Sequence, residues 1–222
     1  ANKDLIIKQN KKDLKVAKEE KYPAALVDRL ALDEKRVIAM AQGLKDTAAL
    51  RDPIGEIMET IERPNGLLIK KVRVPIGVVA IIFESRPNVM ADCIALCLKS
   101  GNSVILKGGK EAAHSNETIF KICRDALKNT AIQTDTIQLV PSKDRKSVEA
   151  LLKLDDLIDL VVPRGGEGLI RFFAENSLIP VIKHFKGVCH IYVSDQADLA
   201  MAEEVCFNAK VQRPGTCNAM EK

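Results

Sequence analysis

The stretch Val74-Pro75-Ile76-Gly77-Val78-Val79-Ala80-Ile81-Ile82-Phe83 has the pattern of a strand buried on both faces. From Gly77 to Phe83 its residues are apolar throughout, without the alternation that marks a half-exposed strand. Strands of this kind belong to parallel sheets whose two faces are covered by helices. The stretch therefore predicts the α/β fold class.

The residues after this stretch alternate short apolar strands with helices, which predicts a Rossmann-like parallel sheet. Further strands are expected at 103–107, 137–140, 157–162 and 181–184, and helices at 89–99, 114–129, 143–153 and 167–176. Because parallel sheets bind ligands at the carboxyl ends of their strands, the loops of interest are 84–88, 107–113, 141–142, 163–168 and 184–187.

The residues before the stretch predict two different structures. Residues 1–50 form a Lys-rich helical segment with an apolar stripe, in which Asp33 is a candidate N-cap. Residues 56–74 predict a projecting β-hairpin, since Asn65-Gly66 between two β-rich runs tolerates the positive φ of a tight turn. A subunit interface and an edge hairpin that covers its own domain are equally compatible with this pattern.

Composition excludes several classes of function. No apolar run approaches the ~20 residues needed to span a bilayer, and no signal peptide is recognisable, so we expect a cytoplasmic protein without membrane contact. The net charge of +4 is mild, and with no Trp and two Tyr the chain has no stacking platform for single-stranded nucleic acid. The six cysteines form no CxxC pair, which argues against a metal site and indicates free, mostly buried thiols.

Two glycine-rich segments stand between a predicted strand and a predicted helix. Lys107, Gly108, Gly109 and Lys110 combine close backbone approach with two cations suited to phosphate. In the segment 163–168, Gly165 and Gly166 precede a helix whose first N–H groups favour an anion. Each segment alone is equally compatible with an ordinary strand–helix turn.

Cys217 lies in the segment Gln212-Arg213-Pro214-Gly215-Thr216-Cys217-Asn218-Ala219, where Pro and Gly interrupt the preceding helix. A thiol near the start of a helix, with Arg213 close in sequence, should have a lowered pKa, and the thiolate is the nucleophilic form. A structural loop cysteine fits the same pattern.

Together these segments resemble the aldehyde dehydrogenase superfamily, and within it the branch of the γ-glutamyl phosphate reductases, also called glutamate-5-semialdehyde dehydrogenases. The resemblance rests on the segments 74–83, 100–107, 83–88, 162–166, 189–193 and 212–219. It implies a coenzyme domain at 1–187 that binds NADP and carries the hairpin at 56–74. It also implies the beginning of a second α/β, catalytic domain at 188–222, where the sequence pattern itself predicts a strand at 189–193 and a helix at 199–210. Because neither end shows a start or stop signal, we expect this domain to be truncated.

The resemblance further implies the reduction of L-glutamyl 5-phosphate to L-glutamate 5-semialdehyde by NADPH, in proline biosynthesis. Cys217 would be the catalytic nucleophile, with Lys107, Gly108, Gly109, Lys110, Gly165 and Gly166 at the coenzyme. A cation at Lys110, where NAD-preferring members often carry an acid, favours NADP.

Arg86, Asn88 and Arg213 are expected at the substrate. Oxidising members carry a general-base Glu in a Glu-Leu-Gly-Gly stretch, where this chain has His184-Phe185-Lys186-Gly187. The absence of that base suits a reductase.

The alternatives are an oxidising aldehyde dehydrogenase and a nucleotide-binding fragment without catalysis. We expect a homo-oligomer with functional coupling to glutamate 5-kinase, and we expect residues 1–222 alone to be inactive.

Overall fold

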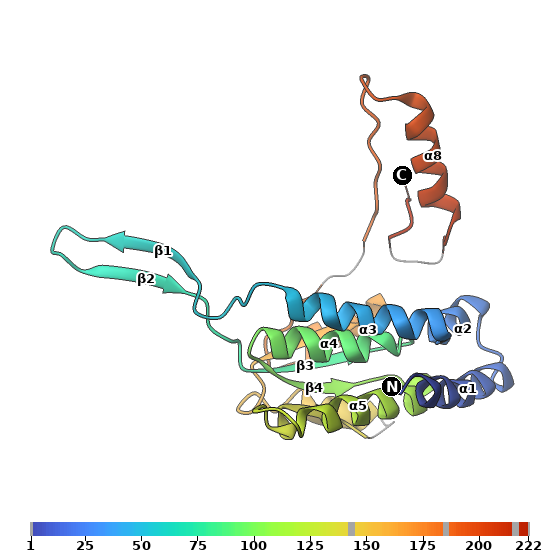
Figure 1. The fold of residues 1–222 in the computed structure, drawn as a ribbon, viewed down its shortest axis with the longest axis horizontal. Coiled ribbons are helices and arrows are strands. Elements are labelled where there is room, and N and C mark those ends of the chain that lie inside the picture. The colour runs from blue at the N-terminus through green and yellow to red at the C-terminus, as the bar shows by residue number, and fades with distance from the viewer. Residues whose placement is uncertain (1, 142–144, 184–186, 215–217, 222) are drawn as a thin grey trace. The chain divides into compact units, whose positions relative to one another are not determined.

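The computed structural model describes residues 2–141, 145–183, 187–214 and 218–221, which form two compact units, 1–183 and 184–222. Figure 1 shows the helices and strands of each unit. The larger unit contains a parallel sheet with helices on both faces, as the sequence predicts. None of the described helices is long and apolar enough to cross a membrane.

The parallel sheet has four strands in the described part of the chain, β3 (Val78–Phe83), β4 (Ser103–Lys107), β5 (Ile137–Leu139) and β6 (Leu160–Arg164). Their spatial order is β5-β4-β3-β6. The chain therefore runs outward from β3 in one direction and then crosses to the other side for β6. Ligands of doubly wound sheets bind where the strand order reverses, here at the carboxyl end of β3.

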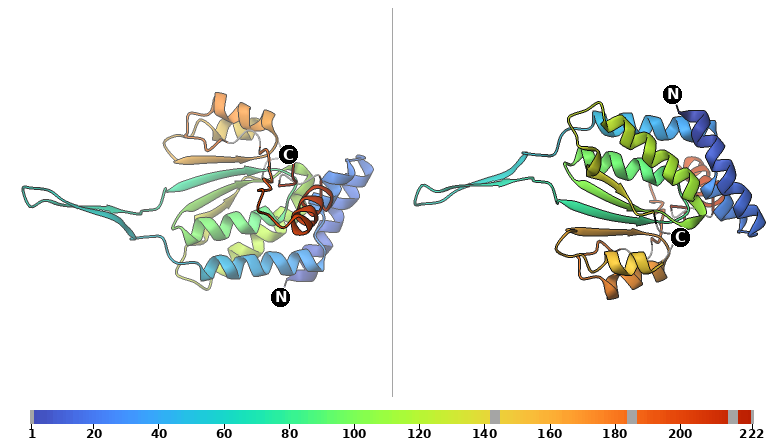
Figure 2. Two further views of the ribbon diagram at one scale, coloured as in Figure 1. Left: turned by 90° about the horizontal axis from the view of Figure 1, so that it is seen from above. Right: turned by 90° about the horizontal axis from the view of Figure 1, so that it is seen from below.

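The side chains of β3 alternate between two hydrophobic clusters. Val79, Ile81 and Phe83 pack with helices α4 (Asn88–Lys99) and α5 (Ala113–Leu127). Ala80 and Ile82 pack with the region of α6 (Arg145–Leu151) and α7 (Glu167–Asn176) on the other face. Figure 2 shows these two helical layers with the strands between them. Each fully buried large apolar side chain contributes about 1.5–3 kcal/mol to the free energy of folding. Because β3 supplies side chains to both clusters, it is the centre of the fold.

Strand β6 begins three residues later than the predicted strand at 157–162, which is a correction. Leu157 is 65% exposed and its N–H donates to the carbonyl of Leu154, so it lies in a turn. The register is set instead by β3, which pairs Val79 with Leu160. The predicted strand at 181–184 is reduced to one bridge between Val161 and Val181 in the residues that the structure describes.

The entry to β3 requires glycine at position 77. Gly77 has a φ of 125°, and a Cβ there would overlap the carboxylate of Asp159. That carboxylate accepts the N–H of Val78 at 2.8 Å, and Asn102 Oδ1 accepts the N–H groups of Ile76 and Gly77 at 2.6 and 2.9 Å. The Pro-Ile-Gly sequence is thus held by two polar side chains from neighbouring loops.

The N-terminal segment forms α1 (Lys3–Glu19), α2 (Ala24–Leu30) and α3 (Glu34–Ala49). Asp33 caps α3 as predicted, because its Oδ1 accepts the N–H of Arg36 at 2.7 Å. Helix α1 is tied to α5 by Asp13, whose buried carboxylate accepts the N–H and the hydroxyl of Ser115 at 2.8 and 2.6 Å. A carboxylate at the start of a helix is stabilised by the helix dipole. Asp13 of α1 therefore acts as a capping group for the N-terminus of α5.

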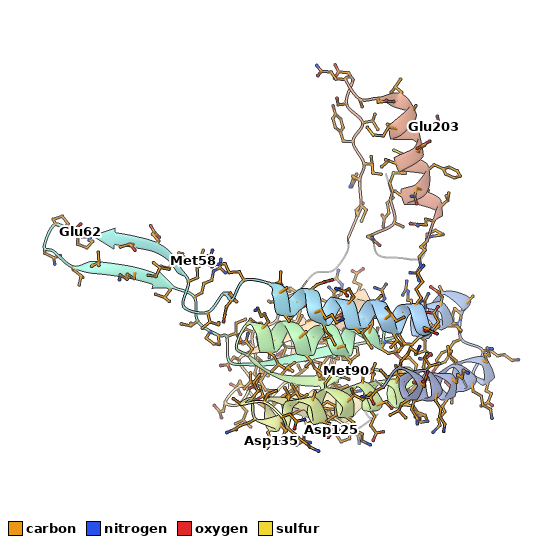
Figure 3. The ribbon with its side chains drawn as sticks, viewed as in Figure 1. Met58, Glu62, Met90, Asp125, Asp135 and Glu203 are labelled. Carbon is orange, nitrogen blue, oxygen red and sulfur yellow. The ribbon has the colours of Figure 1, made fainter. Side chains whose placement is uncertain are left out.

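The predicted hairpin is confirmed as β1 (Ile57–Glu62) paired antiparallel with β2 (Leu68–Val72). Gly66 has a φ of 84°, as an Asn-Gly turn requires. Every residue of both strands is exposed. Figure 3 shows Met58 and Glu62 standing out from the ribbon, whereas Met90 lies among packed helices of the same unit.

The smaller unit contains α8 (Leu199–Val211), which Asp198 caps by accepting the N–H of Ala200 at 2.9 Å. The predicted helix at 199–210 is therefore confirmed. The strand predicted at 189–193 is wrong for the described residues, which run without a ladder there. A strand needs a neighbouring strand for its backbone groups, and the smaller unit provides none in its described part.

The 3₁₀ turns η1 (Lys110–Ala112) and η2 (Thr134–Thr136) precede α5 and β5. The helix predicted at 143–153 begins, in the described residues, at 145 as α6.

Candidate functional site

The larger unit has a cleft of about 700 Å³ at the carboxyl ends of β3 and β4. This is the edge of the sheet at which the sequence predicts ligand binding, and the volume lies in the usual range for small-molecule sites. The cleft is lined by Tyr22, Leu26, Ile82, Phe83, Glu84, Ser85, Lys107, Gly108, Gly109, Lys110, Glu111, Val148, Gly168, Leu169 and Phe172.

The first glycine-rich loop lies in the wall of this cleft with all four of its predicted residues. Lys107 ends β4, and its Nζ donates to the carbonyl of Gly108 at 3.3 Å. A Cβ on Gly108 would overlap the amide of Asn116, and one on Gly109 would overlap the carboxylate of Glu111. A side chain at either position would displace these groups, and the two lysines bring positive charge to the cleft.

The second glycine-rich loop reaches the cleft through Gly168 and Leu169 at the start of α7. Gly165 packs against Glu84 and Leu169, and a Cβ there would lie 2.7 Å from Glu84 Oε2. The N–H of Gly166 donates to the same oxygen at 3.4 Å. A carboxylate of the protein thus stands at the helix start where the sequence predicts an anion.

The turn after β3 is strained and is held by a carboxylate. Ser85 has a φ of 58°, which is unfavourable for a residue with a side chain. Its N–H donates to Glu111 Oε1 at 2.6 Å, and its hydroxyl lies 3.4 Å from the same oxygen. Strain of this kind persists where neighbouring groups fix the backbone, as is frequent at functional sites. Glu111, just after the Lys107 loop, therefore connects that loop to the Glu84–Ser85 turn by hydrogen bonding.

Several lining residues were not anticipated from the sequence. Tyr22 and Leu26 come from the segment that holds α1 and α2, whereas Val148 and Phe172 come from α6 and α7. Glu20, mainly through a hydrogen bond, raises the pKa of Tyr22 to about 12, so the phenol stays neutral. No motif marks these residues, because they are brought to the cleft by helix packing.

The predicted substrate residues Arg86 and Asn88 lie beyond the strained turn, at the start of α4. Asn88 Nδ2 donates to Asp92 Oδ2 at 3.1 Å, along the same helix. Burial raises the pKa of Asp92, and the hydrogen bond from Asn88 opposes this. Neither Arg86 nor Asn88 lines the cleft described above.

The predicted nucleophile, Cys217, lies outside the described residues, as do His184, Phe185 and Lys186. Arg213 is exposed just after the end of α8 in the smaller unit. Among the described thiols, burial raises the pKa of Cys93 to about 12 and the pKa values of Cys97 and Cys123 to about 11. Cys97 is buried, and Cys93 and Cys123 are half-buried, among apolar side chains, so all three are poor nucleophiles.

A parallel α/β sheet with a lysine-bearing, glycine-rich loop in a cleft at its carboxyl edge defines a class of ligand-binding proteins. The chain belongs to the aldehyde dehydrogenase family, whose model matches residues 7–222. This membership implies a nicotinamide coenzyme, NAD or NADP. The residues of the cleft fit such a group, because Gly108 and Gly109 bring backbone close to it and Lys107 and Lys110 match its phosphates.

Among curated proteins the chain is similar to the γ-glutamyl phosphate reductases. It is 54% identical to that of Thermodesulfovibrio yellowstonii over 220 residues, which are 99% of this chain and 53% of the relative. It is also 54% identical to that of a Sulfurihydrogenibium species, with 99% of this chain and 49% of the relative covered. The chain spans about half the length of the curated relatives that it matches.

Among solved structures, the chain is again similar to γ-glutamyl phosphate reductases. The γ-glutamyl phosphate reductase of Thermotoga maritima matches 99% of this chain with 53% of its own, at 44% identity and a TM-score of 0.89. That of Saccharomyces cerevisiae matches 99% of this chain with 55% of its own, at 40% identity and a TM-score of 0.77. An acetylating aldehyde dehydrogenase of Geobacillus thermoglucosidasius, at 18% identity and a TM-score of 0.66 over 99% of this chain and 49% of its own, shares the fold.

Proposed function

We propose that the protein reduces L-glutamyl 5-phosphate to L-glutamate 5-semialdehyde and phosphate with NADPH, as a step of proline biosynthesis. In this proposal residues 1–187 form the NADP-binding domain, and residues 188–222 begin the catalytic domain. The observation that carries the proposal is the Lys107–Lys110 loop in the wall of the cleft, in a chain half identical to proteins named for this reaction. The relatives named for this reaction are longer, and this chain spans about half of their length.

The coenzyme is proposed to bind at the carboxyl edge of the sheet. Lys107 and Lys110 would pair with its phosphates, and Gly108 and Gly109 would let the backbone approach them closely. Lys110 would favour the 2′-phosphate of NADP over a bare ribose. Gly165 and Gly166 would form the second wall, where a phosphate competes with Glu84 for the N–H of Gly166.

Cys217 is proposed to attack the acyl carbon of the substrate as a thiolate. A carbon–sulfur bond forms, the bond between that carbon and the phosphate oxygen breaks, and phosphate leaves with the electron pair. When bound, NADPH supplies the hydride that converts the resulting thioester into the aldehyde. The Cys217 thiolate is released in the same step, and backbone N–H groups near it would stabilise the developing oxyanion.

Arg86, Asn88 and Arg213 are proposed to bind the substrate. The planar guanidinium of an arginine forms two parallel hydrogen bonds with a carboxylate or a phosphate, and the substrate carries both groups. Asn88 retains its side-chain carbonyl oxygen as an acceptor for the ammonium group of the substrate, because the described hydrogen bond to Asp92 uses its Nδ2.

The β1–β2 hairpin is proposed to join subunits of a homo-oligomer. Its exposed apolar side chains include Ile57, Met58, Ile61, Leu68, Ile69 and Val72. A two-stranded ribbon of this kind is marginally stable in water without a packing partner. Functional coupling to glutamate 5-kinase and a location in the cytoplasm complete the proposal.

The test is the Cys217→Ala variant of the full-length protein, assayed for NADPH oxidation that depends on the acyl phosphate. Activity should be lost, because the alanine has no nucleophile. Cys206→Ala, which removes a thiol from α8, serves as the control and should retain activity. Near-normal turnover by Cys217→Ala would contradict the mechanism.

Two further measurements separate the alternatives. NAD-dependent formation of the acid from the semialdehyde in the absence of phosphate would indicate an oxidising aldehyde dehydrogenase. Residues 1–222 alone should show no reductase activity, and detectable turnover by this chain would contradict the proposal that the remaining catalytic domain is required.

A further inference from the structure

Asn116, in the first turns of α5, is a buried side chain whose polar atoms are unpaired. It is 3% exposed, and neither its Oδ1 nor its Nδ2 has a hydrogen-bond partner among the described residues. The other buried polar side chains of the described residues, Asn10, Asp13, Asn102 and Ser115, all form hydrogen bonds. An unpaired buried amide is costly, so its retention in this position calls for a partner in another state of the protein.

The amide of Asn116 lies directly against the first glycine-rich loop. A Cβ built on Gly108 would overlap Nδ2 of Asn116 and would lie 3.1 Å from its Cγ. Gly108 itself lines the cleft. The unpaired amide therefore forms the wall behind the loop that carries the two lysines.

The loop contains a hydrogen bond that a ligand would break. Lys107 Nζ donates to the carbonyl of Gly108 at 3.3 Å, which is long for this type of bond. A phosphate in the cleft offers the ammonium group a charged acceptor in place of the neutral carbonyl, and hydrogen bonds between an ammonium donor and an anionic oxygen are short and strong. Once Lys107 turns to a phosphate, the carbonyl of Gly108 loses its donor while Asn116 Nδ2 is next to that residue.

We infer that Asn116 is a positioning residue of the coenzyme site and that it becomes hydrogen-bonded when the coenzyme binds. Lys107 exchanges the carbonyl of Gly108 for a coenzyme phosphate, and that carbonyl then accepts a hydrogen bond from Asn116 Nδ2. Because this bond exists in the liganded state alone, it strengthens coenzyme binding without stabilising the unliganded protein. The inference rests on the proposed function, since it needs a phosphate-bearing coenzyme in the cleft.

The test compares Asn116→Leu with the wild type in the full-length protein, by fluorescence titration with NADPH and by urea unfolding without ligand. Leucine fills the same space without polar atoms. Affinity for NADPH should fall about tenfold, as expected for one lost hydrogen bond in a buried site. The urea midpoint of the unliganded protein should stay the same or rise, because an unpaired polar group has been removed.

Asn102→Leu is the matched control, since Asn102 is equally buried and is hydrogen-bonded to Ile76 and Gly77 at the other end of β3. It should lower the urea midpoint and leave the NADPH affinity unchanged. If Asn116→Leu behaves in the same way, its amide has a structural partner without ligand and the inference is overturned. If Asn116→Leu does not fold, the smaller and uncharged Asn116→Ala also removes the amide donor and should weaken NADPH binding equally.

A double-mutant cycle with Lys107→Met tests the exchange itself. In the Lys107→Met background no ammonium group leaves Gly108, so Asn116→Leu should change NADPH affinity less than about twofold. A full tenfold effect in that background would overturn the exchange. A wild-type protein that does not bind NADPH would defeat the proposed function together with this inference, whereas equal binding by wild type and Asn116→Leu would defeat the inference alone.

Discussion

The two glycine-rich loops of the larger unit have similar sequences but different surroundings. Both follow a strand of the parallel sheet and precede a helical segment. The 107–110 loop brings Lys107 and Lys110 to the cleft. In the 163–168 loop the N–H of Gly166 already faces the carboxylate of Glu84.

This difference shows that an anion-binding motif depends on the charge that the rest of the fold brings to it. Glu84 follows β3 and Gly166 precedes α7, so the strand pairing of β3 with β6 places them together. The helix dipole of α7 is thereby partly satisfied by a group of the protein. The first loop has two lysines in the wall of the cleft and no such carboxylate at its glycine N–H groups among the described hydrogen bonds, and it is therefore the stronger candidate for phosphate.

Gly108→Ala should have the largest effect of any single substitution in the two loops. The new Cβ overlaps Asn116, which should cost about 1–3 kcal/mol of stability and lower NADPH affinity at least tenfold. Gly43→Ala, within α3, is the matched control, because a Cβ at position 43 would lie at an ordinary contact distance of 3.8 Å from Asp92 Oδ1. The control should be stable and bind NADPH normally. Urea unfolding and NADPH titration measure both quantities, and normal binding by Gly108→Ala would contradict the close packing of this loop.

Lys110→Glu should reverse the charge that is proposed to favour NADP. The ratio of kcat/KM for NADPH to that for NADH should fall about tenfold or more, equivalent to ~1.4 kcal/mol. Lys153→Glu changes the net charge equally at an exposed position after α6 and should leave the ratio unaltered. An unchanged ratio in Lys110→Glu would show that this lysine does not set the coenzyme preference.

Glu84→Gln should sharpen the contrast between the loops by removing the negative charge beside Gly166. Affinity for NADPH should rise a few-fold, since a charge at a helix terminus is worth about 0.3–1 kcal/mol. Isothermal titration calorimetry at two salt concentrations measures the change, which should be smaller at high salt. A loss of affinity would mean that Glu84 itself contributes to binding.

The smallest effect concerns Arg164, at the end of β6 beside the second loop. Burial raises the pKa of Cys93 to about 12, and the charge of Arg164 opposes this shift. Arg164→Met should therefore raise the pKa of the Cys93 thiol further, which slows its alkylation at pH 10 in the folded protein. Faster alkylation would show that opening of the fold, rather than the charge of Arg164, controls the thiol.

The same thiols give the fold a defined pH dependence. The folded pKa values of Cys93, Cys97 and Cys123 lie above the ordinary value of 9.0. The folded state thus holds protons that the unfolded state releases. The contribution of these thiols to the free energy of unfolding is complete below pH 9 and is lost as the pH rises towards about 11–12. Urea midpoints should fall between pH 8 and pH 10.5, and less so in Cys93→Ala. A midpoint that is constant over this range would contradict the burial of the thiols.

The elements that could be predicted from the sequence are those with a local signal. The apolar run before Phe83 gave the central strand, Asn65-Gly66 gave the hairpin and Asp33 gave a helix cap. The start of β6 could not be read from apolarity, because Leu157 is as apolar as Leu160 and the register with β3 decides between them.

The candidate site could be predicted where it follows the chain and not where it depends on distant contacts. The lysine and glycine positions of the first loop were visible as a motif. Two pairings could not be predicted from the sequence, because they arise from the packing of separate elements. Glu84 faces Gly166, 82 positions away, and Asn116 lies behind Gly108.

The most direct test of the central claim is a crystal structure of the full-length protein with NADP⁺ bound. We expect the coenzyme phosphates at the carboxyl edge of the sheet, within hydrogen-bond distance of Lys107 and Lys110, with Asn116 Nδ2 donating to the carbonyl of Gly108. A coenzyme bound elsewhere, with the 107–110 loop unchanged, would contradict the account.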